Sequence, residues 1–144
     1  MPNRADYTDV REFNKLLTEE FRANAGKVTG DFADRPLLIL TTTGARSGQV
    51  HTTPLVYAND DGRMYVVAAA GGAPKHPAWY LNLVVRPSVT VELPGESFPA
   101  NAVVAAGAER ARLVAARLAE SSAFAAYQEK AGREIPFVFL DRTD

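Results

Sequence analysis

The stretch that most constrains the fold runs from residue 37 to residue 55 and reads LLILTTTGARSGQVHTTPL. It opens with four aliphatic residues and three threonines, a run typical of a strand that is buried on both faces. Two glycines then bracket Ala45-Arg46-Ser47, which predicts a turn with exposed backbone N–H groups. The chain returns as a second strand over residues 49–58. Two strands joined by so short a turn form an antiparallel hairpin.

The turn at residues 44–48 has two interpretations. Its backbone N–H groups, together with the charge of Arg46, can cradle an anion. Alternatively, it is a plain hairpin with a polar tip. It is not a nucleoside-triphosphate loop, because the G-K-[ST] ending and the following helix are missing. Pro54, which has no N–H to give to a ladder, marks an edge, a bulge or an opening in the sheet.

Composition narrows the class of protein. The 144 residues suffice for one domain with a real core, and cysteine is absent, which excludes disulfides, thiol nucleophiles and cysteine-bound metals. The only two histidines, His51 and His76, have no carboxylate near them in sequence. A catalytic triad, a zinc site or any other metal site is therefore not expected. A cofactor that carries the chemistry itself fits this chain better.

Charge placement points to an anionic ligand. The formal net charge of −1 gives no reason to expect nucleic-acid binding. Residues 35–91 hold 2 of the 17 acidic residues, where even spacing would place about 7, yet they hold five Lys or Arg and both histidines. Buried strands that lack acids account for part of this bias but not for the arginines. The two acids, Asp60 and Asp61, lie in an N-D-D-G turn and are expected to face water.

Hydrophobic periodicity predicts the remaining elements. A first helix, capped by Thr8 or Asp9, carries the apolar stripe Val10, Phe13, Leu17 and Phe21. This stripe should pack on the core, with membrane or partner contact as the alternative. The remaining segments are expected as strands at 64–69, 88–93, 98–106 and 135–140 and helices at 77–85, 107–120 and 121–132.

Six strands, several of them in hairpins and with helices at both ends, predict an α+β fold built on a largely antiparallel barrel. We expect a single domain over residues 1–144, with an N-terminal helix in residues 1–26 and the barrel and its helices in residues 36–140. The first 13 residues lack an apolar signal core, and no apolar run approaches ~18 residues. These features favour a cytoplasmic location.

The segment GGAPKHPAWYLNL, residues 71–83, also suits a binding wall. Gly71 and Gly72 let the backbone come close to a ligand. Trp79 and Tyr80 place large rings directly behind them, and Asn82 can form a hydrogen bond. The alternative is a helix whose Trp79 packs in the core, and we expect Trp79 to be partly core.

Four segments together resemble the deazaflavin-dependent nitroreductases, which are mainly actinobacterial split-barrel proteins that use the 8-hydroxy-5-deazaflavin coenzyme F420. These are FRANAGKVTG (residues 21–30), the stretch 37–55, AAAGGAPKHPAWYLNL (68–83) and YQEKAGREIPFVFL (127–140). The resemblance covers nearly the whole chain in order. It implies a split β-barrel like those that bind FMN. It also implies hydride transfer from reduced F420 to quinones, nitroaromatics or activated alkenes.

The resemblance further implies which residues hold the ligands. The phosphate and glutamate tail of the coenzyme would face Arg46, Ser47, Gly48 and His51. The deazaflavin ring would lie along Thr53, Pro54 and Leu55. The other wall of the ring site would be formed by Ala68, Ala69, Ala70, Gly71, Gly72, Ala73, Pro74 and Trp79. The small-molecule electron acceptor would bind against Phe124 and Tyr127.

Tyr127 is the residue expected to be catalytic. It lies three positions after Phe124 on one helix face. Its hydroxyl would donate a hydrogen bond to the acceptor oxygen that gains negative charge. The alternative is an aromatic side chain that only covers the barrel mouth.

The chain departs from the family pattern at four positions. The family often has a basic residue at Ala45, arginine at His51, and serine and lysine at Ala69 and Ala70. Up to three missing charges, each worth ~0–1 kcal/mol when exposed, predict weaker binding of the tail. The hydroxyl missing at Ala69 removes the ground for expecting nitroimidazole reduction.

Two other functions remain open from the sequence. One is an FMN-binding split-barrel oxidoreductase, because the single phosphate of FMN needs a smaller basic site. The other is a carrier or sensor that binds the coenzyme without turnover. For all three functions we expect no nucleic-acid partner. Weak membrane contact through the N-terminal helix, at the inner membrane face, is a further expectation.

Overall fold

The structure is a computed structural model that describes residues 8–144. Of the predicted N-terminal segment, residues 1–26, the helix itself begins at Val10, and residues 1–7 lie outside the described range. Asp9 is its cap, since the Asp9 carboxylate accepts a hydrogen bond from the backbone N–H of Arg11 at 2.9 Å.

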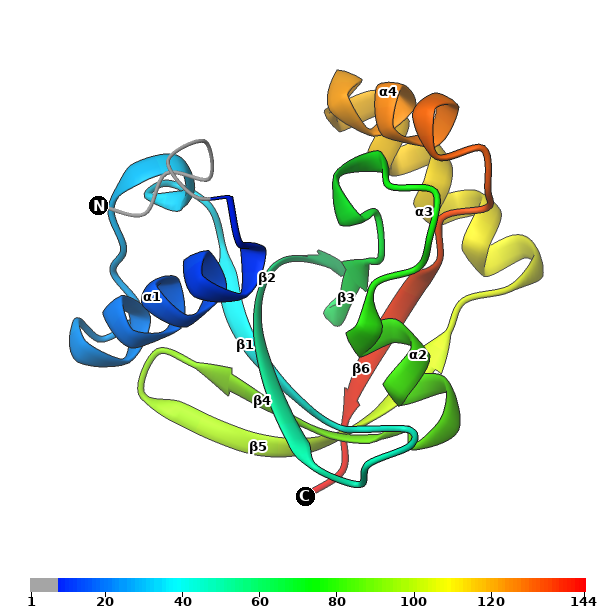
Figure 1. Ribbon diagram of the computed structural model, residues 1–144. Helices are drawn as coiled ribbons and strands as arrows, with labels where there is room; N and C mark the ends of the chain where they lie inside the picture. Colours follow the sequence, from blue (N-terminus) through cyan, green and yellow to red (C-terminus); the bar gives the residue numbers. More distant parts are fainter. Residues whose placement is uncertain (1–7) are drawn as a thin grey trace.

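Six strands form a closed antiparallel barrel in the order β1-β2-β3-β6-β5-β4 (Figure 1). Their bounds are β1 Leu37–Thr43, β2 Val50–Asp60, β3 Arg63–Val67, β4 Ser88–Leu93, β5 Glu96–Val104 and β6 Phe137–Arg142. The barrel confirms the fold class that the sequence predicts.

Helices cover the barrel on two sides, with α1 on one side and α3 and α4 on the other (Figure 1). Their bounds are α1 Val10–Ala23, α2 Ala78–Val85, α3 Gly107–Glu120 and α4 Ser122–Ala131. Within residues 8–144 there are also two short 3-10 helices, η2 Gly30–Phe32 and η3 Ala70–Gly72. Within residues 8–144, no helix combines the length and the apolar composition needed to cross a membrane.

Strand β1 is buried on both faces, as its unbroken apolar run predicts. Leu38 and Leu40 point into the barrel interior, where they join the core that includes Trp79. Leu37 and Ile39 form the core beneath α1. Three of the four residues of the apolar stripe of α1, Phe13, Leu17 and Phe21, therefore serve core packing, whereas Val10 is exposed.

Strand β6 has the same two-sided burial at the opposite side of the barrel. Val138 and Leu140 belong to the interior core, whereas Phe137 and Phe139 belong to the core shared with α3 and α4. Each helical layer is thus attached to the barrel through one strand that faces two cores.

The barrel closes through residues 57–60 of β2 but is open beside residues 50–56, and this opening positions the site. β2 pairs with β1 along residues 50–56, from Val50↔Thr43 to Val56↔Leu37. It pairs with β3 only along residues 57–60. Residues 50–56 therefore have one unpaired edge, and Pro54 lies within it. Of the three meanings considered for Pro54, the opening is the one found.

One expectation about the β2–β3 turn is wrong. Asp61 is exposed as expected, but Asp60 is half-buried and accepts a hydrogen bond from Arg112 of α3 at 2.5 Å. The partner comes from 52 residues away. Because α3 packs beside the turn only in the folded barrel, local turn chemistry does not reveal it.

Candidate functional site

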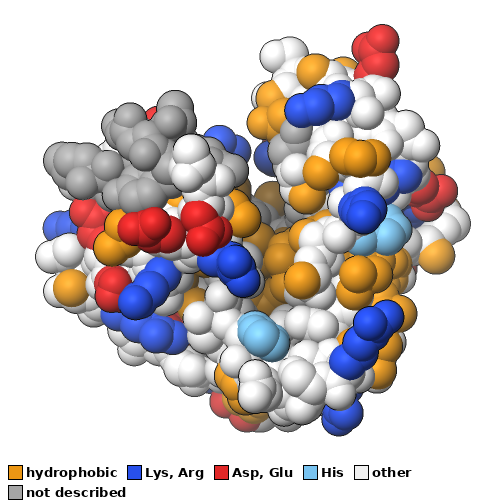
Figure 2. Space-filling view, viewed as in Figure 1, with side chains coloured by type: hydrophobic (Ala, Val, Ile, Leu, Met, Phe, Trp, Pro, Cys, Tyr) orange, Lys and Arg blue, Asp and Glu red, His pale blue; other side chains and the backbone are white. Residues whose placement is uncertain are grey.

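A cleft of about 1670 Å³ opens along the unpaired edge of β2. It is walled by α1, β2, η3, α2 and the α3–α4 corner. Figure 2 shows the hollow, with hydrophobic side chains inside it and Lys and Arg side chains on its rims. Ligand pockets commonly measure ~300–1000 Å³, so this cleft has room for two ligands side by side.

The charge around the cleft favours an anionic ligand. Its lining includes six Lys or Arg side chains and two carboxylates. Three of the six come from α1, the stretch 35–91 supplies Arg35 and Arg46 together with His51, and α3 supplies Arg117. Arg63, which the sequence also placed in the basic segment, instead bonds Asp141 at 2.8 Å and Glu109 at 2.9 Å. The basic character is therefore found, but much of it comes from α1.

The hairpin tip is a closed turn with two free donors. Gly44 N–H donates to Gln49 C=O at 2.7 Å, and Gly48 N–H donates back to Gly44 C=O at 3.0 Å. Gln49 N–H donates to Ser47 Oγ at 3.1 Å. Within residues 8–144, the N–H groups of Arg46 and Ser47 have no acceptor, and Arg46 forms no ion pair. These groups remain available to an anion.

Gly44 allows the turn to close tightly. A Cβ at Gly44 would lie 2.5 Å from Ser47 Oγ and 3.3 Å from His51 Nε2. Ser47 and His51 are thus brought together over the same glycine. The polar tip predicted from spacing is a compact group of side chains at one end of the cleft.

The turn is held in place by α2. Asn82 Oδ1 accepts from the Ala45 N–H at 3.0 Å, and Asn82 Nδ2 donates to Thr42 Oγ1 at 3.4 Å. The sequence marked Asn82 only as able to form a hydrogen bond. Its location on α2 makes it the residue that joins the hairpin tip to the wall carrying Trp79.

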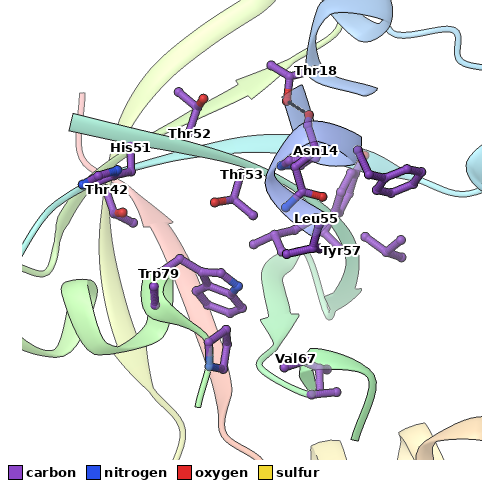
Figure 3. Close-up of a pocket in the computed structure, with 18 of the residues that line it drawn as sticks. Asn14, Thr18, Thr42, His51, Thr52, Thr53, Leu55, Tyr57, Val67 and Trp79 are labelled. Carbon is purple, nitrogen blue, oxygen red and sulfur yellow. Dashed lines mark hydrogen bonds between the residues drawn. The ribbon is translucent and has the colours of Figure 1, made fainter. Parts of the chain in front are cut away.

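The middle of the cleft is lined mainly by apolar side chains, and Thr53 of β2 is the polar residue among them (Figure 3). Figure 3 shows Thr53 and Leu55 of β2 directed into the space between α1 and Trp79, with Val67 on the opposite side. Trp79 is 7% exposed, belongs to the barrel core and also lines the cleft, so it is partly core as expected. The space between Leu55 of β2 and the aromatic ring of Trp79 suits a planar ring system (Figure 3).

The far end of the cleft is formed by α4. Phe124 is 3% exposed and packs edge-on against Phe137, with ring centroids 5.4 Å apart. Tyr127 is 39% exposed and lines the cleft. Of the two aromatic residues expected to contact the acceptor, Phe124 belongs mainly to the core, and Tyr127 is the one that is exposed at the cleft.

The loop around η3 touches α4 directly. A Cβ on Gly72 would lie 3.2 Å from Tyr127 Cα and 3.3 Å from the Tyr127 carbonyl oxygen. Gly72 also has a φ of +83°, where side-chain-bearing residues are strained. The glycine is therefore required by backbone conformation and by close packing.

The residues named from the resemblance divide into two groups. The expected ligand contacts that line the cleft are Arg46, Ser47, His51, Thr53, Pro54, Leu55, Ala69, Ala70, Trp79, Phe124 and Tyr127. Those outside its lining are Gly48, Ala68, Gly72, Ala73 and Pro74, while the place of Gly71 relative to the lining is outside what the structure describes. The second group lies in the hairpin tip and the η3 loop, where it supports residues of the first group.

Sequence reasoning missed the α1 wall. Asn14 and Thr18 line the cleft, and Figure 3 places both on the side of α1 that faces β2. Thr18 Oγ1 donates to the Asn14 carbonyl at 2.7 Å. Each follows a buried residue of the apolar stripe by one position, and the two are spaced by four. This spacing of four residues could have predicted that Asn14 and Thr18 share one helix face beside the buried stripe.

Two of the described residues that line the cleft have a perturbed acidity. The hydrogen bond to Glu92 raises the pKa of Arg22. Tyr65 is 3% exposed, and burial raises the pKa of Tyr65 above its ordinary value. The phenol therefore stays protonated at neutral pH. Among residues 8–144, no cluster of three His, Asp or Glu side chains could hold a metal ion.

Comparisons with known proteins agree with this geometry. Residues 13–142 match the family described as F420H(2)-dependent quinone reductase. An F420H(2)-dependent quinone reductase of Mycobacterium tuberculosis is 36% identical over 110 residues, which are 74% of each chain. The solved structure of an F420-H2 dependent reductase has 35% identity and a TM-score of 0.65, and covers 74% of this chain and 95% of its own. A second solved structure, described as a domain-swapped dimer, has 31% identity and a TM-score of 0.67, and covers 92% and 100%.

Proposed function

The chain belongs to the F420H(2)-dependent quinone reductase family, and from this premise we propose that its cleft binds reduced F420 beside a quinone and reduces the quinone. The observation that carries the proposal is the order of groups along one cleft. The turn at Arg46, with its free N–H groups, lies at one end, the ring of Trp79 in the middle, and the exposed Tyr127 at the far end.

The donor set fits the coenzyme. The N–H groups of Arg46 and Ser47, the Arg46 guanidinium and His51 would hold the anionic tail. Thr53, Leu55 and Trp79 would flank the ring. Pro54, Ala69 and Ala70 complete the two walls, and Gly48, Ala68, Gly71, Gly72, Ala73 and Pro74 give these walls their shape.

When bound, reduced F420 supplies the hydride. The protein's part is to hold the quinone against α4 and to stabilise charge on it. We assign Tyr127 the role of donating its hydroxyl hydrogen bond to the quinone oxygen that becomes negative. The quinone needs one proton in addition to the hydride to become a hydroquinone, and the open cleft admits it from water.

Two further statements complete the proposal. Nitroaromatics and activated alkenes are further candidate acceptors, because the pocket wall at Tyr127 is exposed.

We also propose a cytoplasmic protein that touches the inner membrane face only weakly. Since Phe13, Leu17 and Phe21 of the stripe are buried, that contact would fall to Val10 of the stripe and to Leu16, which are 46% and 38% exposed.

The deciding experiment is a titration of the purified protein with F420, followed by the coenzyme's fluorescence, and then oxidation of reduced F420 by menadione. Saturable binding at micromolar coenzyme with steady turnover is expected. An unchanged fluorescence would reject F420 as the cofactor. A yellow protein with a flavin spectrum as purified would favour FMN. Binding without turnover on any quinone would favour a carrier or sensor.

A further inference from the structure

We propose that Arg133 is a positioning residue that clamps the loop of residues 68–76, one wall of the cleft, to the end of α4. The inference rests on the proposed function, because the loop it concerns belongs to the proposed coenzyme site. Arg133 itself does not line the cleft.

Three contacts of Arg133 are to backbone carbonyls of this loop. Its Nε donates to Ala73 C=O at 3.0 Å. Its Nη2 donates to Ala68 C=O and to Ala69 C=O, each at 3.2 Å. The side chain is half-buried and spans some 60 residues of sequence to make these bonds. One guanidinium thereby fixes both ends of the segment that contains η3.

A fourth contact extends the clamp toward α2. Arg133 Nη1 lies 3.1 Å from His76 Nδ1. Because a guanidinium has no acceptor, His76 Nδ1 must accept, and the imidazole proton belongs on Nε2. The His76 ring in turn packs against Tyr80 of α2, with centroids 4.8 Å apart.

Arg133 is used for its shape rather than its charge. Within residues 8–144 it forms no ion pair, whereas Arg22, Arg63, Arg110 and others bind carboxylates. The planar guanidinium directs several N–H groups along fixed lines, and a lysine ammonium does not reproduce that fork. Carbonyls from three residues on one loop are the kind of target that needs it.

The side of the clamp that belongs to α4 is equally fixed. Gln128 of α4 donates from Nε2 to the Arg133 carbonyl at 2.5 Å and accepts from the Ile135 N–H at 3.4 Å. Gly72 meets the backbone of Tyr127 directly. Arg133 therefore couples the wall at Ala69 and Ala70 to the wall at Tyr127 and sets the space between them.

The test compares Arg133→Lys with Arg110→Lys. Arg110 is the control, since it is also half-buried and donates to a backbone carbonyl, that of Ile135 at 2.7 Å, but its partners Ile135 and Glu134 lie outside the loop of residues 68–76. Three quantities are measured for each protein: amide hydrogen exchange of residues 68–76 without ligand, the F420 dissociation constant, and the unfolding temperature.

We expect Arg133→Lys to speed exchange in residues 68–76 and to weaken F420 binding about tenfold, which corresponds to ~1.4 kcal/mol. Arg110→Lys should lower the unfolding temperature but leave the dissociation constant at the wild-type value. Wild-type exchange or wild-type affinity in Arg133→Lys would overturn the inference. So would an equal loss of affinity in both variants, which would indicate general destabilisation. A failure of the proposed function is distinct, because the wild-type protein itself would then not bind F420.

Discussion

Asn82 Oδ1 accepts a hydrogen bond from the backbone N–H of Ala45 at 3.0 Å, and this contact ties α2 to the tip of the β1–β2 hairpin. The two residues are 37 positions apart in sequence. The turn at residues 44–48 and the cleft wall that carries Trp79 are therefore joined by hydrogen bonds into one unit.

Replacing Asn82 by alanine should loosen this unit. The Ala45 N–H would lose its acceptor, which costs ~1–3 kcal/mol when the group stays buried. We expect a lower free energy of unfolding in urea and a weaker affinity for F420. Asn101→Ala, at an exposed position on β5, serves as the control and should change neither quantity. An unchanged affinity in Asn82→Ala would mean that the tip keeps its shape without α2.

Arg46→Ala tests the anion site. The loss of one charge-assisted contact should weaken F420 binding by roughly 1–3 kcal/mol, or about 5- to 150-fold in dissociation constant. Turnover at saturating coenzyme should barely change, because the tail is remote from the reacting part of the ring. Arg86→Ala is the matched control, since Arg86 is exposed and outside the cleft lining. Equal affinities for the two variants would make the turn a plain hairpin tip.

Tyr127→Phe tests the role of the hydroxyl. Coenzyme binding should stay intact, while quinone turnover should fall on the order of tenfold for one lost donor bond. Steady-state rates with several quinones, with the dissociation constant of F420 measured alongside, separate the two effects. Wild-type rates on every quinone would leave Tyr127 as part of the wall only. A fall in the unfolding temperature would instead point to packing on the η3 loop.

The Asp141–Arg63 pair predicts the acid response of stability. The hydrogen bond from Arg63 lowers the pKa of the Asp141 carboxyl below its ordinary value. A lowered pKa in the folded state stabilises the protein above the unfolded pKa, near ~3.9, and this stability is lost as the pH falls through the folded pKa. The difference in unfolding free energy between wild type and Asp141→Asn should therefore shrink as the pH drops from 6 toward ~2.

A matched variant sharpens this measurement. Asp34 is exposed and forms no ion pair within residues 8–144, so Asp34→Asn should follow the wild-type curve throughout. A gap between wild type and Asp141→Asn that stays constant with pH would contradict the assigned pair.

The sequence revealed the parts of the fold that local pattern encodes. The run at Leu37–Thr43 predicted a strand buried on both faces, and β1 faces two cores. The spacing of Phe13, Leu17 and Phe21 predicted the buried face of α1. Such patterns report burial directly, because strands and helices place apolar side chains at fixed periods.

The parts that escaped prediction depend on distant contacts. The partner of Asp60 is on α3, and the clamp of Arg133 reaches a loop some 60 residues earlier. Asn14 forms part of the cleft wall only because α1 packs beside β2 in the folded protein. No local period encodes these pairs, since they exist only after the barrel has closed.

The position of β6 in the barrel has a consequence for synthesis. β6 is the last strand along the chain, yet it sits between β3 and β5 and pairs with both. While residues 137–142 are still inside the ribosome, the nascent chain has β3 and β5 with open edges and Phe137 and Phe139 missing from their core. The barrel can therefore close only after β6 emerges. Until then those two strand edges have no partner within the chain, and unpaired strand edges are prone to pair with other chains.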